Sequence, residues 1–366
     1  MNIAAPWFNQ NQDEWLREVL QVHFDKDCGT PYWLRREKEL SISVPDEIRR
    51  IDDLKLLGPM VEEDLAVLPL EEFLPRIFLE KKTQLIIGET GGTTGKIKTT
   101  AYSTAEFTYA FVDFLKYVFE KRDFPGGLNW LYLGPSGPHI MFKNARRLAR
   151  ALGSLEPFSI DFDPRWIKKM AKGSLGFERY KEHVLAQAER IFHVQEIGLL
   201  FTTPVMALML GERLTPAKRQ KVGGMHLGGM TLTGNDYRKL REIYPNAVIV
   251  PGYGNTLFGV ALELSAAADN SVNYYPPGPR LILKVIPKNG LPDGQRIAKE
   301  VALGEKGQVM FHRLDKCFFI PNMVERDEAV RVPPSKEGEK WGFHLDGVKD
   351  PGPLSGSGSV LDGGLY

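Results

Sequence analysis

The feature that most constrains the fold of this chain is the alternation, from Lys82 onward, of short apolar runs with amphipathic stretches. Runs of strand length occur at residues 85–87, 128–133 and 247–250. The intervening segments, such as EFTYAFVDFLKYVFEK and NDYRKLREIY, carry apolar residues at helical spacing. Strands that alternate with helices are typical of a sheet covered by crossover helices. The pattern therefore predicts an α/β fold.

The rest of the chain is expected to flank this core. Residues 1–80 have interrupted helical patterns and predict a helical entry segment, whereas residues 81–280 form the α/β core. Beyond residue 280 the runs RLILKVI and GQVMFHR indicate antiparallel strands, which predicts a β-rich subdomain over 281–345. Residues 350–366 are rich in Gly, Ser and Pro and predict an irregular tail.

Composition excludes several classes of function. A net charge of +1 over 366 residues argues against a nucleic-acid-binding protein, which needs a strongly basic face. The only cysteines are Cys28 and Cys317, so neither a disulfide framework nor a cysteine zinc site is expected. The sequence has no signal-peptide pattern and no apolar run of membrane-spanning length. We expect a cytoplasmic protein without a membrane partner. A homodimer is compatible with this composition.

The stretch ETGGTTGKIK, residues 89–98, has the composition of a phosphate-binding loop. It lies between the apolar run 85–87, predicted as a buried strand, and the helix-capping pattern 103–106. Glycines let the backbone approach an anion, while amide groups, threonine hydroxyls and lysine supply donors and charge. A Walker A loop is excluded, because Thr90 replaces its first glycine and Ile97 its final Ser/Thr. The alternative is a solvated Gly/Thr linker.

Three later segments hold further candidates. HLGGMTLT places Gly228 and Gly229 at a strand end, where a flat ring could lie against bare backbone. VIVPGYGNTLFG places Tyr253 between glycines, so that its ring could cover a planar ligand. Asp327 follows a strand-like run and could accept hydrogen bonds from a ribose diol. Each segment also has a structural alternative. The two glycines could form a turn, Tyr253 could be a packed core residue, and Asp327 could be a surface acid.

Together these segments resemble the adenylate-forming superfamily of acyl-CoA synthetases, peptide-synthetase adenylation domains and luciferases, most closely its phenylacetate-CoA ligase-like branch. The resemblance covers nearly the whole chain and implies a large adenylation domain, with mixed sheets flanked by helices and a small antiparallel β region. The phosphate-binding residues that it implies are Thr90, Gly91, Gly92, Thr93, Thr94, Gly95 and Lys98. The implied adenine-binding residues are Gly228, Gly229, Met230, Tyr253, Gly254, Asn255 and Thr256, and Asp327 is the implied ribose ligand.

The resemblance implies that a carboxylate attacks the α-phosphorus of ATP, with Mg²⁺ spanning the phosphates, to give an acyl-adenylate. Aromatic and glycine residues expected near Tyr253 suit a pocket for a flat aromatic acid. The pocket candidates are Tyr132, Ser136, His139, Phe201, Gly252 and Phe258. His139 could equally be a structural loop histidine. Similarity to shortened adenylating proteins of phenazine antibiotic biosynthesis implies a phenazine carboxylate and a partner protein that receives the acyl group.

Two departures from the family pattern matter. Leu257 stands where the family has a glutamate that helps to hold Mg²⁺, so the metal site is expected to be weakened. The family's C-terminal domain, with its phosphate-contacting lysine and its CoA-admitting surface, has no counterpart in this sequence. GFHLDGVKDP, residues 342–351, resembles the hinge to that domain. Residues 346–366 are therefore interpreted as a remnant of the hinge, no catalytic residue is assigned, and CoA is not expected as a cosubstrate.

Two alternative functions remain open at this stage. The length and the loop also resemble acyl-protein synthetases, which pass an acyl group to a cysteine. Cys317 is the late candidate, although its neighbours Phe318 and Phe319 favour an inert core thiol. The chain could also be a catalytically weak scaffold that binds nucleotide or an aromatic acid, as Leu257 and the missing domain suggest.

Overall fold

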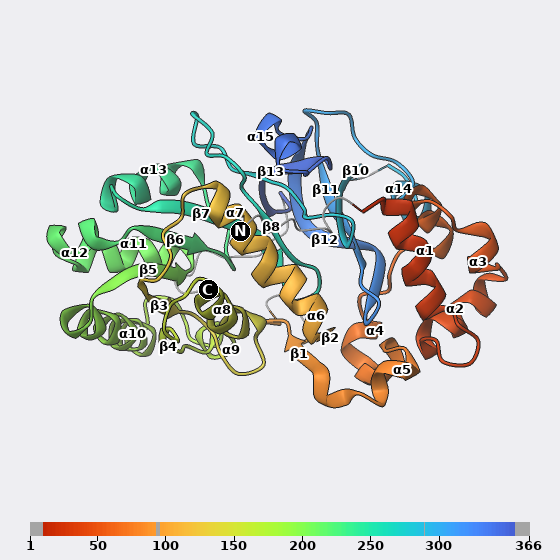
Figure 1. The fold of residues 1–366 in the computed structure, drawn as a ribbon, viewed down its shortest axis with the longest axis horizontal. Coiled ribbons are helices and arrows are strands. Elements are labelled where there is room, and N and C mark those ends of the chain that lie inside the picture. Colours follow the sequence, from red (N-terminus) through yellow and green to blue (C-terminus); the bar gives the residue numbers. More distant parts are fainter. Residues whose placement is uncertain (1–9, 93–95, 289, 356–366) are drawn as a thin grey trace.

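The computed structural model describes residues 10–92, 96–288 and 290–355. A six-stranded sheet and a five-stranded antiparallel sheet lie side by side, with helices around them (Figure 1). The six-stranded sheet has the strand order β4-β3-β5-β6-β7-β8. Its strands from β4 to β7 are parallel, and β8 runs antiparallel to β7. The strands are β3 (Asn129–Leu133), β4 (Phe158–Ile160), β5 (Ile197–Thr202), β6 (Gly224–Leu227), β7 (Val248–Asn255) and β8 (Gly259–Leu262).

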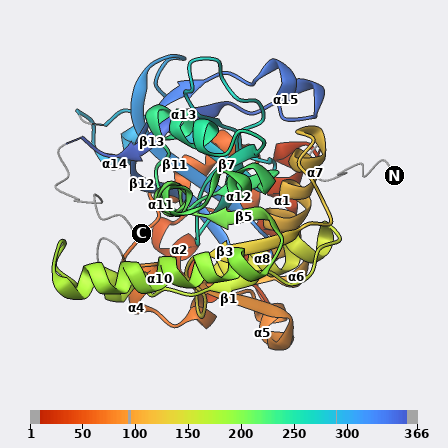
Figure 2. The same ribbon diagram turned by 90° about the vertical axis from the view of Figure 1, so that its left-hand side faces the viewer.

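Helices cover both faces of this sheet. Alternate residues of its strands point to opposite faces, and each face packs in a different apolar cluster. In β3, Leu131 and Leu133 pack in one cluster, whereas Trp130 and Tyr132 pack in the other. The first cluster includes residues from α10 (Leu175–Val194), α11 (Pro204–Arg213) and α13 (Gly234–Ile243). The second includes residues from α6 (Thr104–Phe107), a π-helical segment (Thr108–Asp113), α7 (Phe114–Lys121) and α8 (Ile140–Ala151). The long helix α10 is the yellow-green helix that runs across the lower part of Figure 2.

Helix starts follow the capping signals of the sequence. Ser103 and Glu106 form the predicted capping box at α6, in which each side chain accepts a hydrogen bond from the other residue's backbone amide. Thr203 accepts from the amide of Met206 at the start of α11, and Pro204 occupies its first turn. The short helices α9 (Pro164–Ile167) and α12 (Pro216–Lys221) begin with proline in the same way. The capping box predicted at residues 103–106 is confirmed.

The antiparallel sheet has the strand order β10-β11-β12-β13-β9. Its strands are β9 (Asn273–Tyr274), β10 (Leu281–Ile286), β11 (Lys306–Leu314), β12 (Phe319–Val332) and β13 (Gly347–Pro353), accompanied by α14 (Asp293–Arg296) and α15 (Lys336–Lys340). The predicted antiparallel β region is therefore present. The sheet includes residues on both sides of the boundaries expected at 280 and 345, because β9 precedes the first and β13 follows the second. Asp327 lies within β12 rather than after it.

The N-terminal helices pack against this antiparallel sheet. The indole nitrogen of Trp15 donates to the carbonyl of Leu314 at 2.7 Å, and that of Trp33 donates to Phe319 at 3.1 Å. Buried tryptophans need such partners for their N–H groups. The elements of this region are α1 (Gln12–His23), α2 (Pro31–Leu40), α3 (Val44–Glu47), α4 (Asp64–Val67) and α5 (Arg76–Leu79), with 3₁₀ turns at Ile51–Leu57, Leu70–Phe73 and Lys82–Gln84.

The strand before the phosphate loop differs from its prediction. β1 (Leu85–Glu89) pairs with β2 (Thr99–Ser103) in a separate two-stranded antiparallel sheet. Ile86 is buried, but Ile87 is 48% exposed, so the expectation of a fully buried strand is wrong. A two-stranded ribbon has one face in water, which a run of three apolar residues does not reveal. Within the described residues, no helix combines the length and the apolar character needed to cross a membrane.

Candidate functional site

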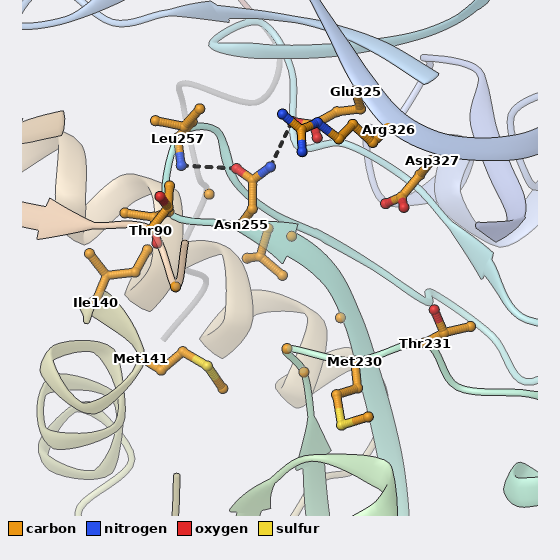
Figure 3. Close-up of a pocket in the computed structure, with 18 of the residues that line it drawn as sticks. Thr90, Ile140, Met141, Met230, Thr231, Asn255, Leu257, Glu325, Arg326 and Asp327 are labelled. Atoms are coloured by element: carbon orange, nitrogen blue, oxygen red, sulfur yellow. Dashed lines mark hydrogen bonds between the residues drawn. The ribbon is translucent and has the colours of Figure 1, made fainter. Parts of the chain in front are cut away.

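A cavity of about 950 Å³ lies where the two large sheets meet. It is lined by the base of the loop that begins at Glu89, by the ends of β6 and β7, by α8 and by β12 (Figure 3). The structure thus brings together segments that are far apart in the sequence. The predicted site residues that line it are Thr90, Gly91, Gly92, Lys98, Phe201, Gly228, Gly229, Met230, Gly252, Gly254, Asn255, Thr256 and Asp327.

The base of the predicted phosphate loop is closed by hydrogen bonds. The amide of Thr90 donates to the carbonyl of Lys98 at 2.9 Å, and the amide of Lys98 donates to Oγ1 of Thr90 at 3.0 Å. Oγ1 of Thr256 donates to the carbonyl of Glu89 at 3.3 Å, which ties the loop to the end of β7. These contacts place the predicted phosphate loop and the segment Tyr253-Gly254-Asn255-Thr256 at one wall of the cavity. Residues Thr93, Thr94 and Gly95 lie outside the described residues.

Lys98 is paired with a carboxylate at this wall. Its ammonium forms an ion pair with Glu62, which also pairs with Arg326 at 3.3 Å. Burial raises the pKa of Glu62, but Lys98 and Arg326 outweigh burial and hold that pKa below its usual range. The positive charge of Lys98, which the sequence assigns to phosphate binding, is therefore balanced by the carboxylate of Glu62. A phosphate entering here has to compete with, or displace, this carboxylate.

The backbone of Gly228 and Gly229 forms a bare wall of the cavity directly after β6. Gly229 has φ +81°, a left-handed conformation that favours glycine. A Cβ on Gly228 would meet only Gly252 O at 3.9 Å and the methyl carbon of Met141 at 4.0 Å. The space beside Gly228 is therefore cavity rather than packed protein. A flat ring fits against such a surface.

Tyr253 and Asp327 lie in contact, although the geometry differs from the one expected. The tyrosine hydroxyl donates to Oδ2 of Asp327 at 2.9 Å, and its ring packs against Phe258 and Tyr274. Tyr253 is not among the residues that line the cavity, but its hydroxyl holds Asp327 at the wall, and its role in covering a ring stays a prediction. Burial raises the pKa of Asp327, and the bond from Tyr253 lowers it in part.

Most of the residues predicted for the acid pocket do not line this cavity. Phe201 and Gly252 line the cavity, but Tyr132, Ser136, His139 and Phe258 do not. Tyr132 is fully buried and donates to the carbonyl of Pro135 at 2.6 Å. The remaining wall of this mostly apolar part consists of Phe111, Ile140, Met141, Asn144, Val205, His226 and Val260. A signal for some of these existed, since Ile140, Met141 and Asn144 are spaced to share one face of α8.

The side chain of Asn255 connects the backbone of Leu257 to the side chain of Glu325. Oδ1 of Asn255 accepts from the amide of Leu257 at 2.9 Å, and its Nδ2 donates to Oε1 of Glu325 at 2.7 Å (Figure 3). Burial and the nearby Asp327 raise the pKa of Glu325 to about 7. Leu257 supplies no oxygen ligand to this wall. Within the described part of the chain, no group of three or more His, Cys, Asp or Glu residues is arranged to hold a metal ion.

The two cysteines lie away from the cavity lining. Cys317 is fully buried in the connection between β11 and β12, rather than within a strand as its neighbours suggested. Burial and the nearby Glu106 raise the pKa of its thiol, which keeps it protonated. Cys28 is half-buried and donates its thiol proton to Asp25 at 3.2 Å.

The arrangement of sheets defines the adenylation-domain fold of the adenylate-forming ligases, as the sequence predicted. The structure of 2-hydroxyisobutyryl-CoA ligase in an open conformation with 2-HIB-AMP and CoA aligns with a TM-score of 0.67 and 13% identity, over 92% of this chain and 72% of that one. The same ligase in its thioesterification state aligns with a TM-score of 0.67 over 97% of this chain and 70% of the ligase chain. At this identity the likeness shows the fold alone.

Sequence comparison finds curated ligases that match part of this chain. D-alanine–D-alanyl carrier protein ligase from Streptococcus pyogenes serotype M5 (strain Manfredo) is 28% identical over 166 residues. The match covers 42% of this chain and 31% of the relative, so the chain spans about a third of the length of that curated relative. The serotype M49 (strain NZ131) ligase matches with the same identity and coverage. No protein-family model matches the sequence.

Proposed function

We propose that this protein activates a carboxylic acid with ATP in the cytoplasm and forms an acyl-adenylate. The observation that carries the proposal is that one cavity joins a glycine wall and Asp327 to a largely apolar part lined by Phe201 and Ile140. One part suits a nucleotide and the other an acid body. In the reaction a carboxylate oxygen bonds to the α-phosphorus of ATP, the bond between that phosphorus and the bridging oxygen breaks, and pyrophosphate leaves with the electron pair.

The residues of this chain take positioning roles in the proposal. Gly228 and Gly229 accommodate the adenine ring, and Asp327 accepts hydrogen bonds from the ribose hydroxyls. Thr90 and Lys98 face the phosphates, which lie at the base of the loop. Mg²⁺, when bound, would screen the phosphate charge; Glu325 is the carboxylate next to Leu257 that could hold it, in place of the family's glutamate.

Within this class, we propose an aromatic acid, such as a phenazine carboxylate, as the substrate and a partner protein as the acyl acceptor. Phe111 and Phe201 at the cavity wall support a flat acid body. The carrier protein named in the matched ligase supports a protein acceptor rather than CoA. Transfer to Cys317 is disfavoured, because a buried protonated thiol cannot attack the adenylate.

The test is acid-dependent exchange between ATP and labelled pyrophosphate, measured with benzoate, phenylacetate, phenazine carboxylates and a long-chain fatty acid. We expect nucleotide binding by the isolated chain, slow exchange with aromatic acids, and a marked increase when lysate of the native producer supplies the partner. Slow exchange is expected because Leu257 supplies no oxygen ligand for Mg²⁺ and because Glu62 neutralises the charge of Lys98. Fast exchange by the pure protein would contradict the need for a partner. A complete lack of ATP binding and exchange would favour the scaffold.

A further inference from the structure

Thr256 joins the two strands that flank the predicted phosphate loop. Its Oγ1 donates to the carbonyl of Glu89, at the end of β1, at 3.3 Å. Its own carbonyl accepts a hydrogen bond from the hydroxyl of Tyr102, in β2, at 2.9 Å. A Cβ on Gly88 would stand only 2.9 Å from the methyl carbon of Thr256, so β1 needs a glycine to approach this closely. Both strands are therefore fixed to one residue that lines the cavity.

Tyr102 holds Thr256 from behind the cavity wall, because it is fully buried and is not among the cavity-lining residues. Burial raises the pKa of Tyr102, against the opposing effect of Arg313, so the hydroxyl keeps the proton that it donates. A hydrogen bond away from water is stronger than one at the surface, and a buried carbonyl without a donor is costly. The position of the Thr256 backbone thus depends on a group outside the cavity.

The ring of Tyr102 is itself held by a buried arginine from β11. The guanidinium carbon of Arg313 lies 3.7 Å from the ring centroid. Its Nη1 donates to the carbonyl of Leu257 at 2.9 Å and to Oγ1 of Thr100 at 2.7 Å, and its Nη2 donates to the carbonyl of Ala101 at 2.6 Å. Arg313 therefore bonds to the same two segments, β2 and the turn after β7, that the hydroxyl of Tyr102 connects.

The spacing between this turn and the phosphate loop matters for a phosphate that lies beside them. Thr90, at the start of the loop, and Leu257, in the turn, stand at the cavity wall in Figure 3. Donors stabilise the charge of a phosphate only when they are held at the right distance, and a displacement of about 1 Å can cost on the order of a hundredfold in rate. A buried connection that fixes the spacing in advance removes the cost of arranging it on binding.

We propose that Tyr102 is a positioning residue for the phosphates of ATP, whose hydroxyl holds Thr256 against the phosphate loop. This inference rests on the proposed function and adds to it a residue that touches no substrate. Loss of the hydroxyl loosens the spacing between the loop and the turn, while Arg313 still holds the ring. Ligands whose phosphates lie at the loop should therefore lose affinity, whereas adenosine, which has no phosphate, should keep it.

The test compares Tyr102→Phe with the matched control Tyr244→Phe. Tyr244 is also fully buried and outside the cavity lining, and its hydroxyl donates to the carbonyl of Ala207 at 2.9 Å. Each variant thus loses one buried bond to a backbone carbonyl. Calorimetry gives the dissociation constants of ATP and adenosine, and thermal melting reports folding. We expect Tyr102→Phe to weaken ATP binding by about fivefold or more and adenosine binding by less than about twofold. Tyr244→Phe should lower the melting temperature to a similar extent and leave both affinities within about twofold of the wild type.

Replacing Tyr102 by 4-aminophenylalanine keeps a donor at the same place and should retain most of the affinity for ATP. This is the variant to measure if Tyr102→Phe does not fold, and a loss of ATP affinity as large as that expected for phenylalanine would then refute the role of the donor. A folded Tyr102→Phe variant that binds ATP as tightly as the wild type refutes the positioning role while the nucleotide site stands. Equal losses for ATP and adenosine would show that the hydroxyl supports the cavity as a whole rather than the phosphates. If the wild type binds neither ligand, the proposed function fails and the inference fails with it.

Discussion

Replacing Asp327 with asparagine tests the nucleotide end of the cavity most directly. Asp327 lies in β12 at the cavity wall (Figure 3), and its Oδ2 accepts a hydrogen bond from the hydroxyl of Tyr253 at 2.9 Å. Asparagine has nearly the same shape and can still accept from Tyr253 through its amide oxygen. The substitution therefore removes the negative charge and one ribose-facing acceptor, and leaves the local packing in place.

The expected loss follows from the kind of bond removed. A hydrogen bond to a charged group contributes about 1.5–3 kcal/mol, which corresponds to roughly a 10- to 150-fold weaker affinity for ATP and AMP. Stability should change by about 1 kcal/mol or less, since the bond to Tyr253 survives. Because burial raises the pKa of Asp327, the wild-type affinity should also fall on acidification, beginning at a higher pH than for an exposed aspartate. Asp327→Asn should lack this pH dependence.

The assay is calorimetric titration of ATP and AMP between pH 5 and 8, with thermal melting as the test of folding. Tyr253→Phe is the matched control, because it removes the hydroxyl that orients Asp327 but keeps the carboxylate. We expect this control to weaken binding by less than about fivefold, because the charged acceptor for the ribose remains and only the bond that orients it is lost. A folded Asp327→Asn variant that binds ATP as well as the wild type does would refute the role of Asp327 and the reasoning behind it.

Three further predictions concern other parts of the chain. Gly228→Val should fill the wall against which the ring rests and weaken AMP binding by about tenfold or more in calorimetry, with little change in melting temperature; unchanged affinity would place the adenine elsewhere. Glu62→Gln should release Lys98 and strengthen ATP binding severalfold while leaving AMP binding unchanged, whereas equal gains for both would show that Lys98 does not face the outer phosphates. Burial raises the pKa of Glu263 from 4.5 to about 7, so the wild-type free energy of unfolding should fall by about 1–3 kcal/mol as the pH rises between these values. Glu263→Gln should remove that fall in urea unfolding, and an unchanged slope would contradict it.

The local motifs could be predicted from the sequence because their chemistry is contained in a few neighbouring residues. The capping box at Ser103, the glycine pair at 228–229 and the loop at 89–98 each need only short-range information. Their order along the chain also led to the correct fold class. Gly228 and Asp327 accordingly lie at one cavity, although about a hundred residues separate them.

The walls of the acid pocket could not be predicted in this way. Tyr132 and Phe201 are register partners on adjacent strands and their rings are 5.5 Å apart, yet only Phe201 reaches the cavity. Which of two apolar neighbours is covered depends on how α8 packs over the strands, and this is a long-range property. The role of Tyr253 was missed for a related reason. Its partner Asp327 comes from another sheet, and sequence spacing says nothing about that contact.

The position of β13 has a consequence for how the chain may be shortened. β13 pairs with both β12 and β9, and its last residue, Pro353, lines the cavity together with the following Leu354. A chain cut before Gly347 would leave the unpaired amide and carbonyl groups of the 14-residue strand β12 exposed along one edge. Exposed edges of this kind recruit strands from other molecules. Shortening at this end should therefore convert a monodisperse sample into aggregates, as well as open the nucleotide end of the cavity to water.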